Sequence, residues 1–337
     1  MKLGFKIKSK KERFSVGIDL GTSSVKAVKL RFAKDTVELC NFILEPVGIE
    51  AREAIKKISQ SFGIDTVNLG IGGPATVIRY VSFPRMSRDE LKKAVKFEAQ
   101  KHIPFSVAET SVDSYVLQPD LPDNKMLVLL AAAKKDFVNQ RLKMAEEVGL
   151  KVNIIDVDSL ALINAFNFNY PVSDTSEAKA IALLNIGAAV SSLNILENGI
   201  PRLSRDIHIG GNNFTHKIMD MLSLELKSAE EMKSNPDSAK DPKVATAIEA
   251  VLGNLGSELR SSFDFYESQS TSSVKKIFLS GGSSFYVSLQ GMLVNLLGME
   301  VEMWDPLKNF SFAQEIDQDK VKAVSGHLAV AIGLALR

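Results

Sequence analysis

The stretch VGIDLGTSSVKAV at residues 16–28 returns in altered form as LLNIGAAVSSLNI at residues 183–195. Each copy has an apolar strand, a polar residue, a glycine turn with small residues and a second apolar strand. Asp19 of the first copy aligns with Asn185 of the second. Glycine turns of this kind offer backbone N–H groups and hydroxyls to a phosphate. Two such hairpins that face each other would hold a polyphosphate from both sides, which predicts nucleotide binding between two halves of a duplicated protein.

The composition is typical of a soluble globular protein and points to no special partner. The chain has 337 residues, 45% hydrophobic and 24% charged, so it is long enough for two domains that each have a core. A formal net charge of +1 gives no reason to expect nucleic acid as a main partner. Cys40 is the single cysteine, so an internal disulfide is impossible and a reducing compartment is favoured.

Residues 1–14 are predicted to form a basic N-terminal tail. No apolar run in the chain approaches the roughly 18 residues that span a bilayer, and the basic start lacks the apolar stretch of a signal peptide. The tail is either solvated or in weak contact with an anionic membrane surface, because each basic residue near such a surface contributes about 1 kcal/mol.

Strands alternate with helices along the chain, and each half begins with a hairpin. This order predicts α/β layers with mixed sheets. Residues 87–150 are predicted to form a compact unit, in the order helix, strand, strand, helix. Ser87 and Glu90 form a capping box that starts its first helix, and Pro104 prevents that helix from continuing. We therefore expect a small α+β insertion in the first half.

Three motifs carry a resemblance to a known superfamily. They are IDLGTSS at residues 18–24, the second glycine hairpin, and LSGGS at residues 279–283. In this order they resemble the phosphate-1, phosphate-2 and adenosine motifs of the actin/Hsp70/sugar-kinase superfamily. The resemblance implies an α/β protein with a duplicated actin-like, RNase H-like ATPase fold, in which two halves surround a nucleotide cleft.

A narrower resemblance is to the PilM family of type IV pilus assembly proteins, which are relatives of the cell-division protein FtsA. It covers residues 14–337. The stretches that carry it are 16–29, 83–105, 205–215 and 258–266. The insertion after Ser82 also lies where FtsA and PilM proteins have their extra subdomain.

The resemblance implies a division of the chain into five parts. They are a basic tail (1–14), a first actin-like core (15–82 and 151–178), an inserted subdomain of the FtsA/PilM type (83–150), a second actin-like core (179–206 and 273–337) and a helical subdomain (207–272).

In this superfamily magnesium-bound ATP lies in the cleft, so the resemblance implies ATP and Mg²⁺ as cofactors. Asp19 would hold the metal through water, or it is a polar cap at a strand end. Lys26 would neutralise phosphate charge if its side chain points into the cleft. Glu230 and Lys233 share a helix face and would reach the ribose and adenine, or they form a surface ion pair. The implied nucleotide-binding residues are Asp19, Gly21, Thr22, Ser23, Ser24, Lys26, Gly187, Ala188, Ala189, Gly210, Gly211, Glu230, Lys233, Gly281, Gly282 and Ser283.

The second hairpin departs from the superfamily pattern. It usually begins with aspartate, whereas this chain has Asn185, and Ala188 and Ala189 replace a threonine-rich turn. An amide orients water but cannot accept its proton. Asp158 begins the helix after the central strand, where it would hold water or metal or act as a helix N-cap. Asp158 and Asn185 are the candidate catalytic residues, and we expect nucleotide binding with slow or absent hydrolysis.

The PilM resemblance implies a cytoplasmic ATP-binding scaffold at the inner face of the bacterial inner membrane. Such a protein would bind the cytoplasmic N-terminal peptide of the inner-membrane protein PilN and act with other pilus assembly proteins and motors, so its membrane association would be indirect. An extended peptide would dock between the first core and the insertion. The apolar residues near that site, most of them expected in the core, are Phe83, Pro84, Phe97, Ile103 and Phe105.

Two other functions use the same fold. A small-molecule kinase needs a carboxylate base, and Asn185 counts against one. A polymerising protein like FtsA ends in an amphipathic membrane helix, whereas this chain is expected to stop directly after its last core helix. Self-association stays open.

Overall fold

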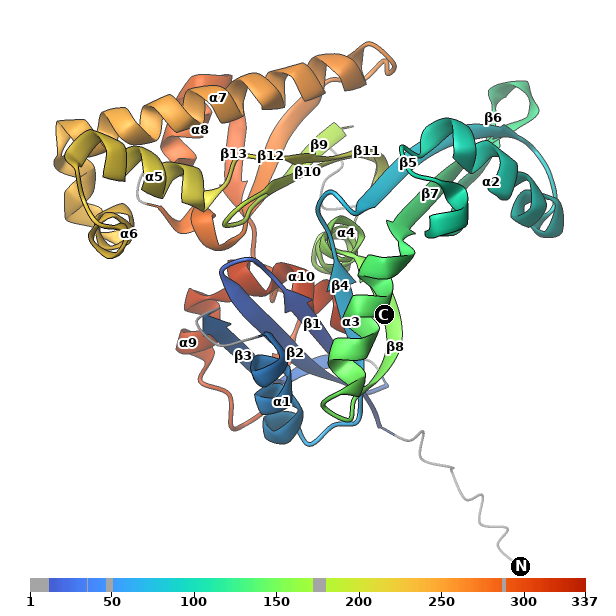
Figure 1. Cartoon of the computed structure of the whole chain (residues 1–337). Helices are drawn as coiled ribbons and strands as arrows, with labels where there is room; N and C mark the ends of the chain where they lie inside the picture. The colour runs from blue at the N-terminus through green and yellow to red at the C-terminus, as the bar shows by residue number, and fades with distance from the viewer. Residues whose placement is uncertain (1–11, 35, 47–50, 172–179, 287–288) are drawn as a thin grey trace, which may run out of the picture.

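The computed structural model describes residues 12–34, 36–46, 51–171, 180–286 and 289–337 (Figure 1). The predicted basic tail at 1–14 therefore lies almost wholly outside the described residues. Three sheets organise the described part of the chain, with six, five and three strands. The first two contain parallel and antiparallel pairs, so the predicted α/β layers with mixed sheets are confirmed.

The first sheet has the strand order β14-β3-β2-β1-β4-β8. The neighbours β1, β2 and β3 are antiparallel, whereas β4 runs parallel to β1 and to β8. Its strands are β1 (Arg13–Leu20), β2 (Ser24–Phe32), β3 (Val37–Pro46), β4 (Thr66–Ile71), β8 (Lys151–Val157) and β14 (Ser311–Phe312). Helix α1 (Ala51–Phe62) packs its apolar side on one face, where Ile55 and Ile58 are buried against Val16 and Ile18.

The second sheet repeats this plan with the order β11-β10-β9-β12-β13. Its strands are β9 (Ala180–Ile186), β10 (Ser191–Glu197), β11 (Ile200–Ile207), β12 (Val274–Ser280) and β13 (Glu300–Met303). The first three are antiparallel, and β12 runs parallel to β9, as β4 does to β1. This shared order is the structural form of the sequence repeat.

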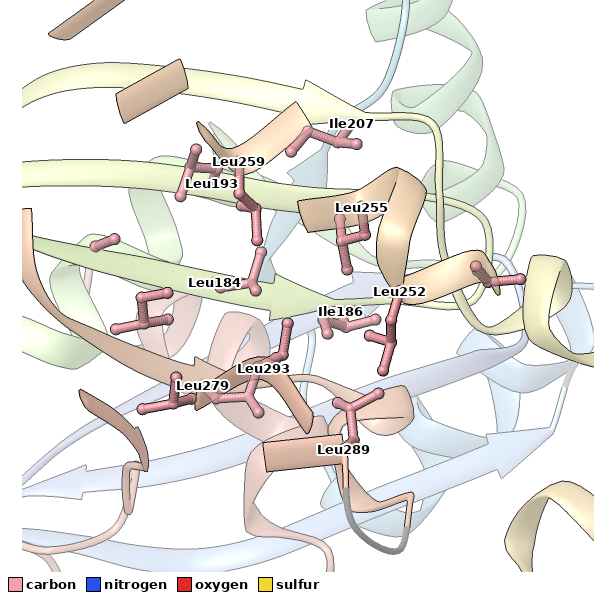
Figure 2. Close-up of a cluster of buried hydrophobic side chains, with 14 of the residues drawn as sticks. Leu184, Ile186, Leu193, Ile207, Leu252, Leu255, Leu259, Leu279, Leu289 and Leu293 are labelled. Carbon is pink, nitrogen blue, oxygen red and sulfur yellow. The ribbon is translucent and has the colours of Figure 1, made fainter. Parts of the chain in front are cut away.

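Helices cover the outer face of the second sheet. They are α5 (Gly211–Leu222), α6 (Leu226–Ser234), α7 (Pro242–Glu267) and α8 (Leu289–Leu297). Figure 2 shows leucine and isoleucine side chains of the sheet, such as Leu184 and Leu193, meeting Leu255 of α7 and Leu289 of α8. The long helix α7 lies across the top of this half in Figure 1.

Two apolar helices, α4 (Asp158–Asn169) and α10 (Ser325–Ala335), lie between the two sheets (Figure 1). Their close crossing depends on glycine, because a Cβ at Gly333 would lie 1.7 Å from the carbonyl oxygen of Ala161. A Cβ at Gly17 would likewise lie 2.2 Å from the carbonyl oxygen of Ala331. Helix α10 thus packs on β1, and β14 extends the first sheet, although both come from the segment predicted for the second core. A short helix, α9 (Gln318–Ala323), precedes α10.

The insertion is built on the third sheet, of order β5-β7-β6. Its elements are β5 (Thr76–Pro84), α2 (Arg88–His102), β6 (Thr110–Leu121) and β7 (Lys125–Lys134). The predicted capping box of Ser87 and Glu90 at the start of α2 is confirmed. Among the described residues we find no helix with the length and apolar composition that a bilayer crossing needs.

Two elements depart from the predicted limits of the insertion. Strand β5, which we expected mostly in the first core, pairs with β7 and packs Phe83 against Val128. Helix α3 (Lys135–Glu146), which we expected in the insertion, buries Ala145 in the core of the first sheet. The physical reason is that an alternating or amphipathic pattern shows that one face is buried but not which neighbour covers it.

Candidate functional site

A cavity of about 660 Å³ opens between the first sheet, the second sheet and the insertion. Its volume lies in the range of small-molecule sites. It brings both glycine hairpins together, although more than 160 residues separate them. The predicted site residues that line it are Asp19, Gly21, Thr22, Ser23, Lys26, Asp158, Asn185, Gly187, Ala188 and Ala189. The insertion closes part of the rim, where the Tyr80 hydroxyl of β5 lies 2.7 Å from the Ser204 hydroxyl of β11.

The first hairpin places an ion pair at the cavity. Asp19 and Lys26 lie opposite each other in the β1–β2 register, and Lys26 Nζ is 3.1 Å from Asp19 Oδ2. Both residues line the cavity, so Lys26 points into the cleft, the direction that strand alternation left open. A Cβ at Gly21 would lie 2.4 Å from Lys26 Nζ, so glycine leaves room for the ammonium group above the turn. Ser24 is buried at the start of β2 and does not line the cavity.

The second hairpin is fixed by the start of helix α5. The N–H of Gly211 donates to the carbonyl oxygen of Gly187 at 2.9 Å, and the N–H of Asn212 donates to that of Ala188 at 2.8 Å. A Cβ at Gly210 would lie 2.7 Å from the Ala188 oxygen. Glycine at this position therefore allows the turn and the helix N-terminus to approach closely.

The loop at residues 281–283 lies beside the same hairpin and outside the cavity lining. Ser283 Oγ donates to the carbonyl oxygen of Gly187 at 3.0 Å. Gly281 has φ of +96°, and a Cβ there would lie 2.4 Å from the carbonyl oxygen of Ile186. A Cβ at Gly282 would lie 2.8 Å from the His327 ring. Residues 281–283 therefore pack against the turn of the second hairpin.

Glu230 and Lys233 form the ion pair that their spacing allowed, but its lysine is buried, whereas the Glu230 side chain is 45% exposed. Lys233 is 6% exposed. Its Nζ lies 2.6 Å from Glu230 Oε1 and 2.6 Å from Thr215 Oγ1, and 3.4 Å from the carbonyl oxygen of Gly211. It also lies 5.0 Å from the centroid of the Tyr286 ring. The pair thus adjoins the start of α5 but does not line the cavity.

Asp158 is the first residue of α4 and faces the cavity. The N-cap position is Val157, and no side chain caps this helix, so the N-cap alternative for Asp158 is wrong. Its Oδ1 is buried and has no hydrogen-bond partner among the described residues. A Cβ at Gly70, in β4, or at Gly72, just after this strand, would lie 2.3 or 2.4 Å from its carboxylate oxygens, so these two glycines make room for it.

The electrostatics around Asp158 are unusual. Burial raises the pKa of its carboxyl group well above the ordinary value, and the Asp19 carboxylate raises it further. Lys26 opposes that rise, and so does the more weakly acting Arg141. A carboxyl group that is poorly solvated and lies in a cleft is typical of a functional site rather than of a stabilising contact.

The residues present fit a phosphate-bearing ligand. Gly21 and Gly187 lack a Cβ, so the backbone of each turn is open to a ligand. Thr22 and Ser23 add two hydroxyls to the first turn, and Lys26 supplies positive charge. Among the described residues, no group of three or more histidine, cysteine or acidic side chains is arranged to hold a metal ion. A magnesium ion here would rely on Asp19, water and ligand phosphates, as this ion commonly does.

The cavity also has lining residues that the sequence did not single out. Arg141 of α3 and Asp206 of β11 both line it, and Asp206 Oδ1 accepts a hydrogen bond from Ser192 Oγ at 2.9 Å. Arg141 carries no local motif, and Asp206 lies within the stretch 205–215 that carries the PilM resemblance but was not singled out as a site residue. The available signal for Arg141 is that it shares a helix face with Phe137 and Met144, where an apolar residue is expected.

The apolar residues proposed near the peptide site divide into two kinds. Phe83 and Ile103 are buried in the insertion, at 3% and 7% exposure, as expected of core residues. Phe97 on α2 is 74% exposed, Pro84 is exposed and Phe105 is half-buried, so two of the five residues, rather than most of them, lie in the core.

Comparison with known proteins agrees with this architecture. The solved PilM–PilN type IV pilus biogenesis complex contains a chain that is 25% identical and superposes with a TM-score of 0.84, covering 96% of this chain and 98% of that one. The ethanolamine utilization protein EutJ from Carboxydothermus hydrogenoformans is 12% identical with a TM-score of 0.56, over 96% and 89% of the two chains. The predicted actin-like α/β fold is confirmed. Residues 17–337 match the family described as type IV pilus assembly protein PilM, and the chain belongs to that family.

Proposed function

We propose that this protein is an ATP-binding scaffold of type IV pilus assembly at the cytoplasmic face of the inner membrane. Membership of the PilM family and the likeness to a solved PilM–PilN complex support the role in pilus assembly. The observation that carries nucleotide binding is the meeting of two glycine hairpins, from two separate sheets, at one cavity.

In this proposal the two turns hold the phosphates. Residues 21–23 and 187–189 provide backbone N–H groups, and Lys26 balances part of the phosphate charge. Asp19 holds Mg²⁺ through water, because this ion keeps several waters and takes few carboxylates beside phosphate oxygens. Bound Mg-ATP supplies a polyphosphate that bridges the two halves.

The nucleoside would lie beside the second hairpin, near the start of α5. The buried Lys233 and its partner Glu230 support this placement, because Lys233 Nζ lies 3.4 Å from the carbonyl oxygen of Gly211 at the start of α5. The proposed nucleoside-binding residues are Gly210, Gly211, Glu230, Lys233, Gly281, Gly282 and Ser283. The five-part division of the chain also stays a proposal, with β5 moved to the insertion and α3 to the first core.

Hydrolysis should be slow. Asn185 lines the cavity where the superfamily usually has a carboxylate, and an amide cannot act as a general base. Asp158 offers a carboxyl group elsewhere in the cleft and is the residue we propose to hold water there.

The proposed partner is a PilN-like inner-membrane protein that binds through its cytoplasmic N-terminal peptide. The likeness to a chain of the solved PilM–PilN complex supports this choice. Membrane association would then be indirect, and other assembly proteins and motors would act on the same scaffold. The proposal does not specify whether the protein associates with itself.

A peptide-binding experiment tests the partner directly. A fluorescent synthetic peptide with the N-terminal cytoplasmic sequence of the PilN-like protein from the same genome is titrated with the full chain, and anisotropy is recorded. We expect saturable binding, and no binding of a scrambled peptide of equal charge. Equal binding of both peptides would overturn the proposed partner.

A further inference from the structure

Helix α3 connects the insertion to the first core. It directly follows β7 of the insertion sheet and precedes β8 of the first sheet. Near its start, Phe137 packs with Ile78 and Leu129 of the insertion sheet. Near its end, Ala145 is buried in the core of the first sheet. A ligand that contacts α3 would therefore touch the helix that joins the insertion to the first core.

Arg141 lies in the middle of α3 and lines the cavity. Its guanidinium carbon is 5.0 Å from the centroid of the Phe137 ring. Its Nε is buried and has no hydrogen-bond partner among the described residues. A buried polar hydrogen without an acceptor is costly, so this donor indicates a missing partner.

The surroundings of Arg141 indicate the chemistry of that partner. Burial lowers the pKa of its guanidinium group, and the acidic groups that act on it are Asp158 and Asp19. Neither forms an ion pair with it, and Asp19 is already paired with Lys26. Asp19 and Asp158 line the same cavity as the first glycine turn, and a Cβ at Gly21 would lie 3.5 Å from Asp19 Oδ1. An anion bound there would supply the missing acceptor, and a guanidinium group suits a phosphate because it donates two parallel hydrogen bonds.

We propose that Arg141 contacts the terminal phosphate of a bound nucleoside triphosphate, so that the cleft distinguishes triphosphate from diphosphate through a residue of the insertion junction. This inference rests on the nucleotide binding proposed above. The sequence motifs account for the phosphate turns and the metal, whereas Arg141 adds a contact that depends on the last phosphate. Because α3 packs against both the insertion and the first core, that contact makes the position of the insertion depend on whether a triphosphate or a diphosphate is bound.

Calorimetric titration of the full chain with Mg-ATP and with Mg-ADP tests the proposal. We compare the wild type with Arg141→Gln, with Arg141→Lys and with Lys143→Gln, an exposed position on the same helix that loses the same charge. Arg141→Gln should weaken Mg-ATP binding by about tenfold or more and Mg-ADP binding by about twofold or less. Arg141→Lys should recover part of the loss, and Lys143→Gln should match the wild type.

The outcomes distinguish a failure of the Arg141 contact from a failure of nucleotide binding itself. Equal weakening of Mg-ATP and Mg-ADP, or no weakening, in a variant that melts like the wild type overturns the role of Arg141 and leaves nucleotide binding intact. Absence of binding of both nucleotides to the folded wild type overturns the proposed function, and the inference falls with it.

Discussion

The charged carboxyl group of Asp158 should destabilise the folded protein, so we predict that Asp158→Asn raises its thermal stability. Oδ1 of Asp158 is buried without a hydrogen-bond partner among the described residues. Burial and the Asp19 carboxylate raise the pKa of the group well above its ordinary value. Asparagine has nearly the same shape and no charge, so the substitution removes a poorly solvated charge and its repulsion with Asp19.

Asparagine keeps an unsatisfied polar group at this place, so the gain comes from the charge alone, and we scale it by the cost of burying a group without partners, about 1–3 kcal/mol. Because Asp158 is partly exposed to the cavity, we take the lower part of that range, about 1–2 kcal/mol. An unfolding entropy of about 2.1 cal/mol/K per residue amounts to about 0.7 kcal/mol/K for 337 residues. The unfolding midpoint of nucleotide-free protein should therefore rise by about 1.5–3 °C near neutral pH.

The gain should depend on pH in a defined direction. A carboxyl group whose pKa is raised by folding costs stability as the pH rises from its unfolded pKa, 3.8, towards its folded pKa. The gain from Asp158→Asn should be largest at neutral pH and disappear at pH values near 4 or below, where the carboxyl group is protonated in both states. Scanning calorimetry of both proteins across this range measures it.

Asp156→Asn is the matched control, two residues earlier. Asp156 is also buried, but its Oδ2 lies 2.5 Å from Arg337 Nε and its Oδ1 accepts from the N–H of Val157 at 2.9 Å. Removing its charge should lower stability by about 1–3 kcal/mol. A stability change of the same sign in both variants, or a gain in Asp158→Asn that is constant with pH, would refute the electrostatic reasoning.

Three further predictions concern packing and the cleft. Gly333→Ala should destabilise the protein by about 3 kcal/mol in urea unfolding, because its Cβ would lie 1.7 Å from a backbone oxygen of α4 that cannot move alone; a loss below about 0.5 kcal/mol would contradict the close crossing. Gly21→Ala should lower the melting temperature only slightly and weaken Mg-ATP binding in calorimetry, because its Cβ would lie 2.4 Å from the end of the flexible Lys26 side chain and 3.0 Å from the carbonyl oxygen of Ser24; unchanged affinity would count against the first turn as a phosphate site. Tyr80→Phe should cost about 1 kcal/mol or less in urea unfolding, because Ser204 keeps its 2.6 Å hydrogen bond to Asn194; a much larger loss would mean that the insertion depends on this contact.

The parts of the fold that could be predicted are those with a local pattern. The two hairpins, the capping box of α2 and the alternation of strands and helices each depend on residues within about ten positions of one another. The assignment of β5 and α3 to their sheets could not be predicted, because it depends on which apolar surface each element meets. The same holds for β14, two residues long, which joins the first sheet from near the end of the chain.

The candidate site divides in the same way. The turns at Gly21 and Gly187 carry a recognisable motif, so their meeting at one cavity was expected. The burial of Lys233 and the unpartnered Oδ1 of Asp158 could not be predicted from spacing, which also allowed a surface pair and an N-cap. Arg141 carried no motif, because its place in the cleft depends on how α3 packs between two bodies.

The central claim is that Mg-ATP binds between the two hairpins, and calorimetric titration into nucleotide-free protein tests it most directly. We compare the wild type with Asp19→Ala and with Asp264→Ala, an exposed aspartate on α7 that does not line the cavity. The account predicts one binding site in the wild type and in Asp264→Ala, and a severe loss of affinity in folded Asp19→Ala. Equal affinity in all three proteins, or no binding to the folded wild type, would contradict it.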